Sequence, residues 1–446
     1  MRSDVFYSAL KARIEAGEWA AGERLPSIRT FVKQARATYH HVVAGCARLV
    51  ADGVLRAEPG RGYFVSASRA AAPAPSTPGG VLDDALFKLL QGGQQFIKLG
   101  CGWLPAPWRD TELLAKAIRR TARLEQHSLA EYGDISGYLP LRQQLSTHLA
   151  RATRLRIAPA QLITTLGATQ ALDWVARLLI QPGDTVLVDE PGNGNLIKLI
   201  QLAGGNVVGV RRTQHGPDID TLKACLARHT VKAFFCNSTY HNPTGGTLSA
   251  SHAFSVLQLA AQHNFYIIED DVYGDFFPGV RQTFAALDNL DRVLYIGSFS
   301  KCLSASLRVG YIACPERFVA PLTQLKLLTC VAVPAFCERF VNTILADGTY
   351  AGHMRQLHQK LLAQQARTQH ALASRGWRFD TLPEGGMFLW VHHPAMADLT
   401  PFIARLEKSQ VLLMPGSAFA VEEDYRGYLR INSSHFSPAL EPLFDV

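Results

Sequence analysis

A lysine flanked by hydroxyl side chains has the clearest chemical potential in this sequence. Residues 297–301 are Gly-Ser-Phe-Ser-Lys, and Arg308 follows seven residues after Lys301. A lysine forms a Schiff base with an aldehyde only when its amine is neutral, and burial beside other cations keeps it neutral. The hydroxyls of Ser298 and Ser300 and the guanidinium of Arg308 are groups that bind phosphate. Taken alone, the pattern also fits a surface lysine in a serine-rich turn.

Other segments carry polar groups of a matching kind. Asp270 and Tyr273 follow an apolar run, and a carboxylate there can pair with the protonated ring nitrogen of a pyridine cofactor. Asn242, within His-Asn-Pro-Thr-Gly, can donate to a phenolic oxygen. Ala168 and Thr169 open a helical pattern whose backbone amides can bind a phosphate. Each segment also has a plainer interpretation, as a solvated acidic turn, an Asn-Pro turn or an ordinary helix cap.

The elements that must position these residues alternate between strands and helices. Short, continuous apolar runs predict strands that are buried on both faces of a parallel sheet, with helices between them in a doubly wound α/β layout. Such sheets bind ligands beyond the carboxyl ends of their strands, and the polar segments lie at those ends. Their joint occurrence therefore predicts a single cofactor site. The predicted strands are residues 185–189, 206–210, 232–236, 265–269 and 292–297.

The first 66 residues predict a small DNA-binding module. An apolar residue at every fourth position from Phe6 predicts a first helix, Ser27 begins a second and Thr38 caps a third. The Pro-Gly-Arg-Gly sequence of residues 59–62 lies between two short strand-like runs and predicts a hairpin turn. Three helices followed by a hairpin form a winged helix-turn-helix.

Charge and composition limit the class of protein. The chain has 446 residues, is 48% hydrophobic and 18% charged, and carries a formal net charge of +8, which is typical of a globular protein with more than one folding unit. Residues 1–69 hold eleven Lys and Arg against six Asp and Glu, which favours contact with a phosphate backbone, although a solvated basic face gives the same excess. A Pro- and Ala-rich segment, residues 67–80, predicts a short linker to an α/β domain of residues 81–446.

The same composition indicates a compartment. No apolar run is long enough to span a bilayer, and the N-terminus has no signal-peptide pattern. The eight cysteines include no Cys-x-x-Cys pair, which favours reduced thiols over disulfides or a bound metal. We therefore expect a cytoplasmic protein without a membrane partner or a metal site.

These motifs together resemble known families. Residues 81–446 resemble the fold-type I pyridoxal-phosphate enzymes of the aminotransferase class. Residues 1–66 resemble the GntR winged helix, through Gly-Glu-Arg-Leu-Pro-Ser-Ile-Arg at 22–29 and Gly-Arg-Gly-Tyr-Phe-Val at 60–65. The fusion in this order is similar to the MocR subfamily of GntR regulators. The resemblance implies a homodimer that binds pyridoxal 5'-phosphate and a double-stranded DNA operator, and that responds to the cofactor or to an amino acid or amine condensed with it.

The resemblance also implies a role for each site residue. Lys301 is the lysine that would carry the cofactor as a Schiff base, and Asp270 would face the pyridine nitrogen. Arg430 would bind the α-carboxylate of an amino acid with its bidentate fork, and Tyr132 would reach the phosphate of the neighbouring subunit. The other implied cofactor contacts are Asn242 and Tyr273 at the phenolic oxygen and Ala168, Thr169, Ser298, Ser300 and Arg308 at the phosphate.

The third helix of the DNA-binding module starts differently from its relatives, with Ala-Arg-Ala-Thr-Tyr-His-His in place of a Gly-Val-Ser-Arg-like turn. The N-terminal part of a recognition helix contacts bases in the major groove. The alternatives to DNA contact are that Tyr39 packs on the second helix and that Arg61 is merely solvated. We do not expect His40 and His41 to bind a metal, because no third ligand is apparent. The DNA contacts that we expect are Thr38, Tyr39, His40 and His41 at the start of this helix and, at phosphates, Arg29, Arg36 and Arg61.

Asn193 marks a departure at the cofactor end. It lies two positions after Pro191, where relatives place an aromatic residue that stacks on the pyridine ring. Loss of stacking weakens cofactor packing and lowers the expected efficiency of transamination. The alternative function, an active aminotransferase with an appended DNA-binding module, is supported by the presence of Lys301, Asp270 and Arg430.

Overall fold

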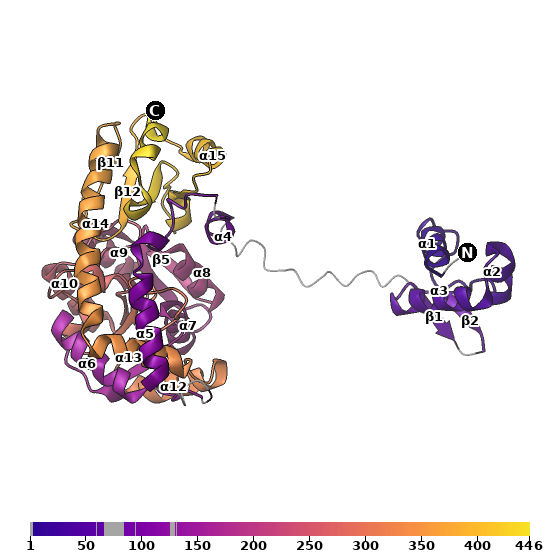
Figure 1. Cartoon of the computed structure of the whole chain (residues 1–446), viewed down its shortest axis with the longest axis horizontal. Coiled ribbons are helices and arrows are strands. Elements are labelled where there is room, and N and C mark those ends of the chain that lie inside the picture. The colour runs from indigo at the N-terminus through magenta and orange to yellow at the C-terminus, as the bar shows by residue number, and fades with distance from the viewer. Residues whose placement is uncertain (1–2, 59, 67–83, 94, 125–129, 131) are drawn as a thin grey trace. The chain divides into compact units, whose positions relative to one another are not determined.

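The computed structural model divides the chain into two compact units, Met1–Val81 and Leu82–Val446, each with its own hydrophobic core. The predicted linker, residues 67–80, lies outside the described residues. Within the described part, no helix combines the length and apolar character needed to cross a membrane. All eight cysteines are free thiols. The structure describes residues 3–58, 60–66, 84–93, 95–124, 130 and 132–446 (Figure 1).

The N-terminal unit is the predicted winged helix-turn-helix. Its second and third helices begin where expected: the side chain of Ser27 accepts from the amide of Thr30, and that of Thr38 accepts from the amide of His41. The hairpin pairs antiparallel, with Leu55 opposite Val65. The elements are α1 (Ser3–Glu15), α2 (Ile28–Ala35), α3 (Tyr39–Ala51), β1 (Leu55–Glu58) and β2 (Gly62–Val65).

An eight-stranded sheet organises the C-terminal unit, in the order β3-β10-β9-β8-β7-β4-β5-β6. The five predicted strands are present and form a parallel block, while β10 and β6 pair antiparallel with their neighbours. The strands are β3 (Leu162–Thr165), β4 (Thr185–Glu190), β5 (Asn206–Thr213), β6 (Gly216–Pro217), β7 (Val231–Asn237), β8 (Tyr266–Asp270), β9 (Val293–Ser298) and β10 (Gly310–Ala313).

Helices bury both faces of this sheet, which explains why its strands are apolar throughout. Successive residues point to opposite faces: Phe234 belongs to one core cluster, and Phe235 to the other. One face is covered by α7 (Ala168–Leu179), α8 (Gly194–Leu202) and α12 (Glu316–Thr329), and the other core includes α5 (Thr111–Leu124), α6 (Leu139–Thr153), α9 (Ile219–Arg228), α10 (Ala250–His263), α11 (Phe284–Asp288), α13 (Ala335–Ala346) and α14 (Thr349–Ala373).

A smaller antiparallel sheet, which the sequence analysis did not predict, lies in the C-terminal part. Its order is β11-β12-β14-β13, and its core includes Leu389, Leu429 and Ile431. The amide of Asn432 donates to the carbonyl of Leu99, so this sheet also holds the segment that follows α4. The remaining elements are α4 (Asp84–Gln91), α15 (Thr400–Lys408), β11 (Arg378–Phe379), β12 (Phe388–His392), β13 (Met414–Pro415) and β14 (Tyr428–Asn432).

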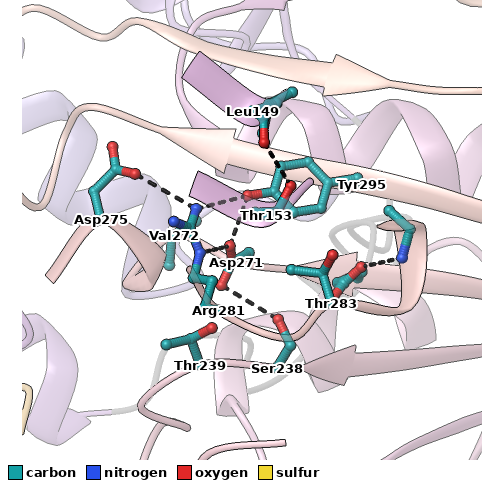
Figure 2. A network of polar contacts seen from close by, with 12 residues as sticks. Leu149, Thr153, Ser238, Thr239, Asp271, Val272, Asp275, Arg281, Thr283 and Tyr295 are labelled. Atoms are coloured by element: carbon teal, nitrogen blue, oxygen red, sulfur yellow. Dashed lines mark hydrogen bonds and ion pairs between the residues drawn. The ribbon is translucent and has the colours of Figure 1, made fainter. Parts of the chain in front are cut away.

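A buried ionic network supports the loop that follows β8. Figure 2 shows the guanidinium of Arg281 between Asp271 and Asp275. Its Nε donates to Asp271 Oδ2 at 2.7 Å, and one Nη donates to Tyr295 at 3.1 Å. Asp271 also accepts from the hydroxyl of Ser238 at 3.2 Å. Because the side chains of Arg281 and Asp271 are both almost completely buried, each charge depends on the other for its solvation.

We predict that Arg281→Met lowers the free energy of unfolding by about 3–5 kcal/mol, because two carboxylates stay buried without their cation. Urea denaturation followed by tryptophan fluorescence measures the change. Arg426→Met is the control, since Arg426 forms an exposed ion pair with Asp424, and we expect it to change little. Equal stability of the two variants would contradict a structural role for the network.

Candidate functional site

A cavity beyond the carboxyl ends of the parallel strands brings most of the predicted cofactor residues together, and this is where parallel α/β sheets bind their ligands. Residues from distant parts of the sequence meet there, including the end of β8, the loop after β9 and the smaller sheet. Ser298, Ser300, Arg308 and Tyr132 do not line it. The predicted site residues that line it are Ala168, Thr169, Asn242, Asp270, Tyr273, Lys301 and Arg430. Asn193, the departure from the family pattern, lines it as well.

Lys301 points into this cavity without an ion-pair partner among the described residues. Its Nζ donates to the carbonyl oxygen of Gly102 at 2.9 Å and lies 6.0 Å from the centre of the Tyr273 ring. Burial and the positive charge of Arg430 lower the pKa of the Lys301 amine to about 8. The neutral form that Schiff-base formation requires is therefore far more populated near pH 7 than in an ordinary lysine.

Asp270 is the carboxylate of the cavity. It ends β8, is 7% exposed, and accepts from the amide of Val272 at 3.3 Å. Burial, with a smaller contribution from the neighbouring charge of Asp271, raises the pKa of Asp270 to about 7. A cationic ring nitrogen beside it would favour the ionised form, which is the pairing that a pyridine cofactor needs.

Arg430 and Asn242 lie in contact in the lining of the cavity. Arg430 donates from Nη1 to Asn242 Oδ1 and from Nη2 to the carbonyl of Gly100, both at 2.6 Å, while its Nε is buried without a partner. The guanidinium lies 4.7 Å from the Phe388 ring centre and 4.8 Å from that of Phe419. Since the oxygen of Asn242 is used by Arg430, its amide NH2 remains the group that can donate to a cofactor oxygen.

The predicted phosphate end lies at the N-terminus of α7. Arg308 donates to the carbonyl of Leu166 at 2.8 Å, and a Cβ on Gly167 would come within 3.0 Å of the same guanidinium. Gly167 also has φ +78°. Glycine is therefore favoured here both by the left-handed backbone and by the space that Arg308 occupies. Ser298 accepts from the amide of Ser300 at 3.2 Å, and the hydroxyl of Ser300 is buried without a partner. A buried hydroxyl without a partner is a group that can donate to an anion such as a phosphate.

Two other predicted residues take different positions. Tyr132 is 87% exposed, which leaves its ring free for another molecule. Asn193 lines the cavity, but it is the N-cap of α8, and its oxygen accepts from the amide of Asn195 at 3.2 Å. Its side chain is therefore engaged by its own helix.

An ionic group that was not predicted from the sequence borders the cavity through Asp189 and His241. Arg212 lies 3.1 Å from Asp189 Oδ1, and His241 lies 3.4 Å from Asp189 Oδ2. Burial opposes ionisation, but the charges of Arg212 and His241 prevail and lower the pKa of Asp189 to about 2. Asp189 lies near the end of β4, as Asp270 lies at the end of β8, so its position could have marked it as a candidate residue. Nothing in the sequence indicated that Asp189 pairs with Arg212, which lies on another strand.

The candidate DNA interface is the start of α3 with the hairpin. Tyr39 is 61% exposed and outside the core, which disfavours packing on α2. The Nδ1 of His41 lies 3.0 Å from Thr38 Oγ1, so its other ring nitrogen is available for a base. His40, Arg29 and Arg36 are also exposed. No group of metal-binding side chains occurs in the described part of the chain.

The hairpin adds a positive tip. Glu58 pairs with Arg56 at 2.8 Å and with Arg61 at 2.7 Å, so one carboxylate is shared by two cations. The side chain of Arg61 is 72% exposed and lies over the ring of Phe64. This geometry holds Arg61 outward at the turn, where a phosphate can reach it.

Comparisons with known proteins agree with the two predicted domains, the DNA-binding module and the aminotransferase-like domain. The family model for aminotransferase class I and II matches residues 94–443, and that for bacterial regulatory proteins of the gntR family matches residues 3–65. An uncharacterised HTH-type transcriptional regulator of Bacillus subtilis, YdfD, is 27% identical over 96% of this chain and 91% of its own length. Aromatic-amino-acid aminotransferase 1 of Thermococcus litoralis is 27% identical over 75% of this chain and 82% of its own. The kynurenine aminotransferase structure from Pyrococcus horikoshii has a TM-score of 0.73 and 25% identity, covering 80% and 90% of the two chains.

The fold and site thus define an aminotransferase-like domain joined to a GntR-type module. The chain belongs to the aminotransferase class I and II family, whose fold-type I members depend on pyridoxal phosphate. The combination with a GntR domain is the MocR architecture. The predicted fold class is confirmed.

The lowered pKa of Lys301 predicts how cofactor attachment depends on pH. Only the neutral amine attacks the aldehyde of pyridoxal phosphate, so the rate should rise about tenfold per pH unit below pH 8 and level off above it. Stopped-flow absorbance with the cofactor-free full chain measures this rate. Lys301→Ala is the control and should give no such signal. A rate that stays constant from about pH 6 to 9, or one that still rises about tenfold per unit near pH 9.5, would contradict an amine whose pKa is about 8.

Proposed function

We propose that the protein is a transcriptional regulator that binds pyridoxal 5'-phosphate and whose binding to double-stranded DNA responds to the cofactor or to an amino compound condensed with it. One observation carries the proposal: a cavity with the groups of an aminotransferase site occurs in the same chain as a GntR-type module whose third helix, α3, begins with exposed side chains.

The residues of the cavity fit this cofactor. Pyridoxal phosphate supplies an aldehyde and an electron-withdrawing ring. Lys301 presents an amine with a lowered pKa to the aldehyde, and Asp270 is placed for the ring nitrogen. The orphaned hydroxyl of Ser300 and the N-terminus of α7 suit the phosphate. Arg430, with a free Nε, is placed to bind the carboxylate of an amino acid.

Two further features of the proposal concern assembly. The exposed Tyr132 supports a homodimer in which this ring contributes to the phosphate site of the partner. Dimerisation also matches the DNA end, because paired recognition helices bind operators with two half-sites. Ligand control then requires only that the ligand has different affinities for two arrangements of the dimer.

An active aminotransferase is the second candidate, and the intact set of Lys301, Asp270 and Arg430 favours it. Against it, Asn193 caps its own helix at the position where the resemblance places an aromatic ring. A turnover assay with a panel of amino donors and 2-oxo acids separates the two functions. Sustained product formation at about 1 s⁻¹ or faster would reverse their order.

Operator binding tests the proposed regulation directly. We predict that adding pyridoxal phosphate changes the dissociation constant of the full chain for a selected DNA fragment by fivefold or more, about 1 kcal/mol of coupling. Fluorescence anisotropy of the labelled fragment measures this change. Lys301→Ala should bind the fragment and lose the response. Specific DNA binding that is indifferent to the cofactor would refute the regulatory part.

The position of Arg61 gives a prediction for the DNA end. Arg61→Ala should weaken binding to all DNA sequences alike and reduce the slope of log K against log salt by about 1, because it removes one phosphate contact. Arg177→Ala, which removes an exposed cation from α7, should change neither quantity. A loss confined to one operator position would instead assign Arg61 to a base.

A further inference from the structure

A buried carboxylate that does not line the cavity joins two parts of the C-terminal unit. Glu190 ends β4 and is 3% exposed. Its side chain accepts hydrogen bonds from two consecutive amides of the segment between β13 and β14. The amide of Val421 lies 3.0 Å from each carboxylate oxygen, and the amide of Glu422 lies 3.1 Å from Oε2. Glu190 therefore ties the edge of the large sheet to a segment of the smaller sheet, 231 residues later in the sequence.

The surrounding backbone makes room for this contact and adds to it. A Cβ on Gly209, which lies on the neighbouring strand β5, would come within 2.4 Å of Glu190 Oε2, so the carboxylate occupies space that a side chain would take. The amide of Gly192 donates to the carbonyl of Phe419 at 2.8 Å. Residues 419–422 are thus held against the end of β4 by side-chain and backbone hydrogen bonds together.

The start of this segment reaches the cavity. Phe419 lines it, is 3% exposed, and has its ring centre 4.8 Å from the guanidinium of Arg430. Trp390, on β12, packs edge-on against the same ring, with the ring centroids 5.6 Å apart. A cation near an aromatic ring is attracted by the ring's electrons, and more strongly where water is excluded. The position of Phe419 therefore helps to fix the orientation of the Arg430 guanidinium.

The position of Phe419 depends on what holds its segment. Phe388, the other ring beside the Arg430 guanidinium, belongs to β12 and is fixed by the sheet, whereas Phe419 lies outside the strands. Glu190 holds the segment by charge, since hydrogen bonds to an ionised acceptor are roughly twice as strong as those between neutral groups. Burial, opposed by the two amides, raises the pKa of the Glu190 carboxyl to about 7, so the carboxylate is the main form at pH 8.

Resting on the proposed function, we propose that Glu190 is a positioning residue for ligand recognition: by holding residues 419–422, it keeps the ring of Phe419 on Arg430 and the guanidinium oriented toward the carboxylate of an amino acid. Glu190 acts through this segment and not by contact with the ligand. Its loss should therefore weaken ligands that carry a carboxylate far more than amines that lack one.

Two pairs of ligands test the inference on the full chain loaded with pyridoxal phosphate at pH 8, with the cofactor absorbance as the readout. L-phenylalanine is paired with phenethylamine, and L-alanine with ethylamine, so that the members of each pair differ only in the carboxylate. Glu190→Leu, which fills the same space without an acceptor, should weaken the amino acids by about fivefold or more and the amines by less than about twofold. Glu190→Gln, which keeps an acceptor oxygen, should restore most of the affinity.

A matched control separates the positioning role from a loss of charge. Glu423→Gln removes an exposed carboxylate from the same part of the chain and should change none of these dissociation constants. Equal weakening of amino acids and amines in Glu190→Leu, or no weakening of either, overturns the inference. No spectral change with either amino acid in the loaded wild-type chain also overturns it, while leaving a cofactor-responsive regulator intact. A chain that takes up no pyridoxal phosphate overturns the proposed function and the inference with it.

A double-mutant cycle shows whether Glu190 acts through Phe419. If it does, Glu190→Leu should weaken the amino acids less in a Phe419→Leu background than in the wild-type chain, because the contact that it supports is already lost. Fully additive losses would refute the inference. If Glu190→Leu does not fold, Glu190→Asp takes its place, since it keeps the charge but its carboxylate ends one methylene short of the two amides. Wild-type affinity for the amino acids in that variant would refute the inference as well.

Discussion

The burial of the parallel strands on both faces is the constraint on which the rest of the C-terminal unit depends. Such strands can carry almost no polar side chain along their length, so polarity concentrates where they end. Four adjacent strands, β4, β7, β8 and β9, bring Asp189, Asn237, Asp270 and Ser298 to one edge. The ligand cavity forms there because the edge is where the fold can hold charge at all.

Holding charge at that edge has a structural cost, which the ionic networks below it offset. Asp271, next to Asp270, is neutralised by Arg281, and Asp189 by Arg212. Without these cations, several buried carboxylates would lie close together and would oppose one another's ionisation. Of the two described carboxylates that line the cavity, Asp189 has an arginine partner and Asp270 has none.

The sequence predicted what depends on local pattern. The caps at Ser27 and Thr38, the five parallel strands and the residues at their ends all follow from spacing over fewer than ten residues. Contacts between distant segments were not predictable in this way. Arg430 meets Asn242 across 188 residues, and it does so from a small sheet with strands as short as two residues. The pairing of Asp189 with Arg212 was likewise not predictable, because the two residues lie on different strands.

The hydrogen bonds that Arg430 already makes have an energetic consequence for recognition. One hydrogen of each Nη is used, for Asn242 and for Gly100, before any ligand arrives, and Nε is buried without a partner. An incoming carboxylate therefore meets a guanidinium that is already fixed in place, with Nε–H and one hydrogen on each Nη left to donate, so binding costs little side-chain entropy. The guanidinium then works as a common anchor that orients every amino acid alike, and discrimination among them falls to the part of the ligand that displaces water.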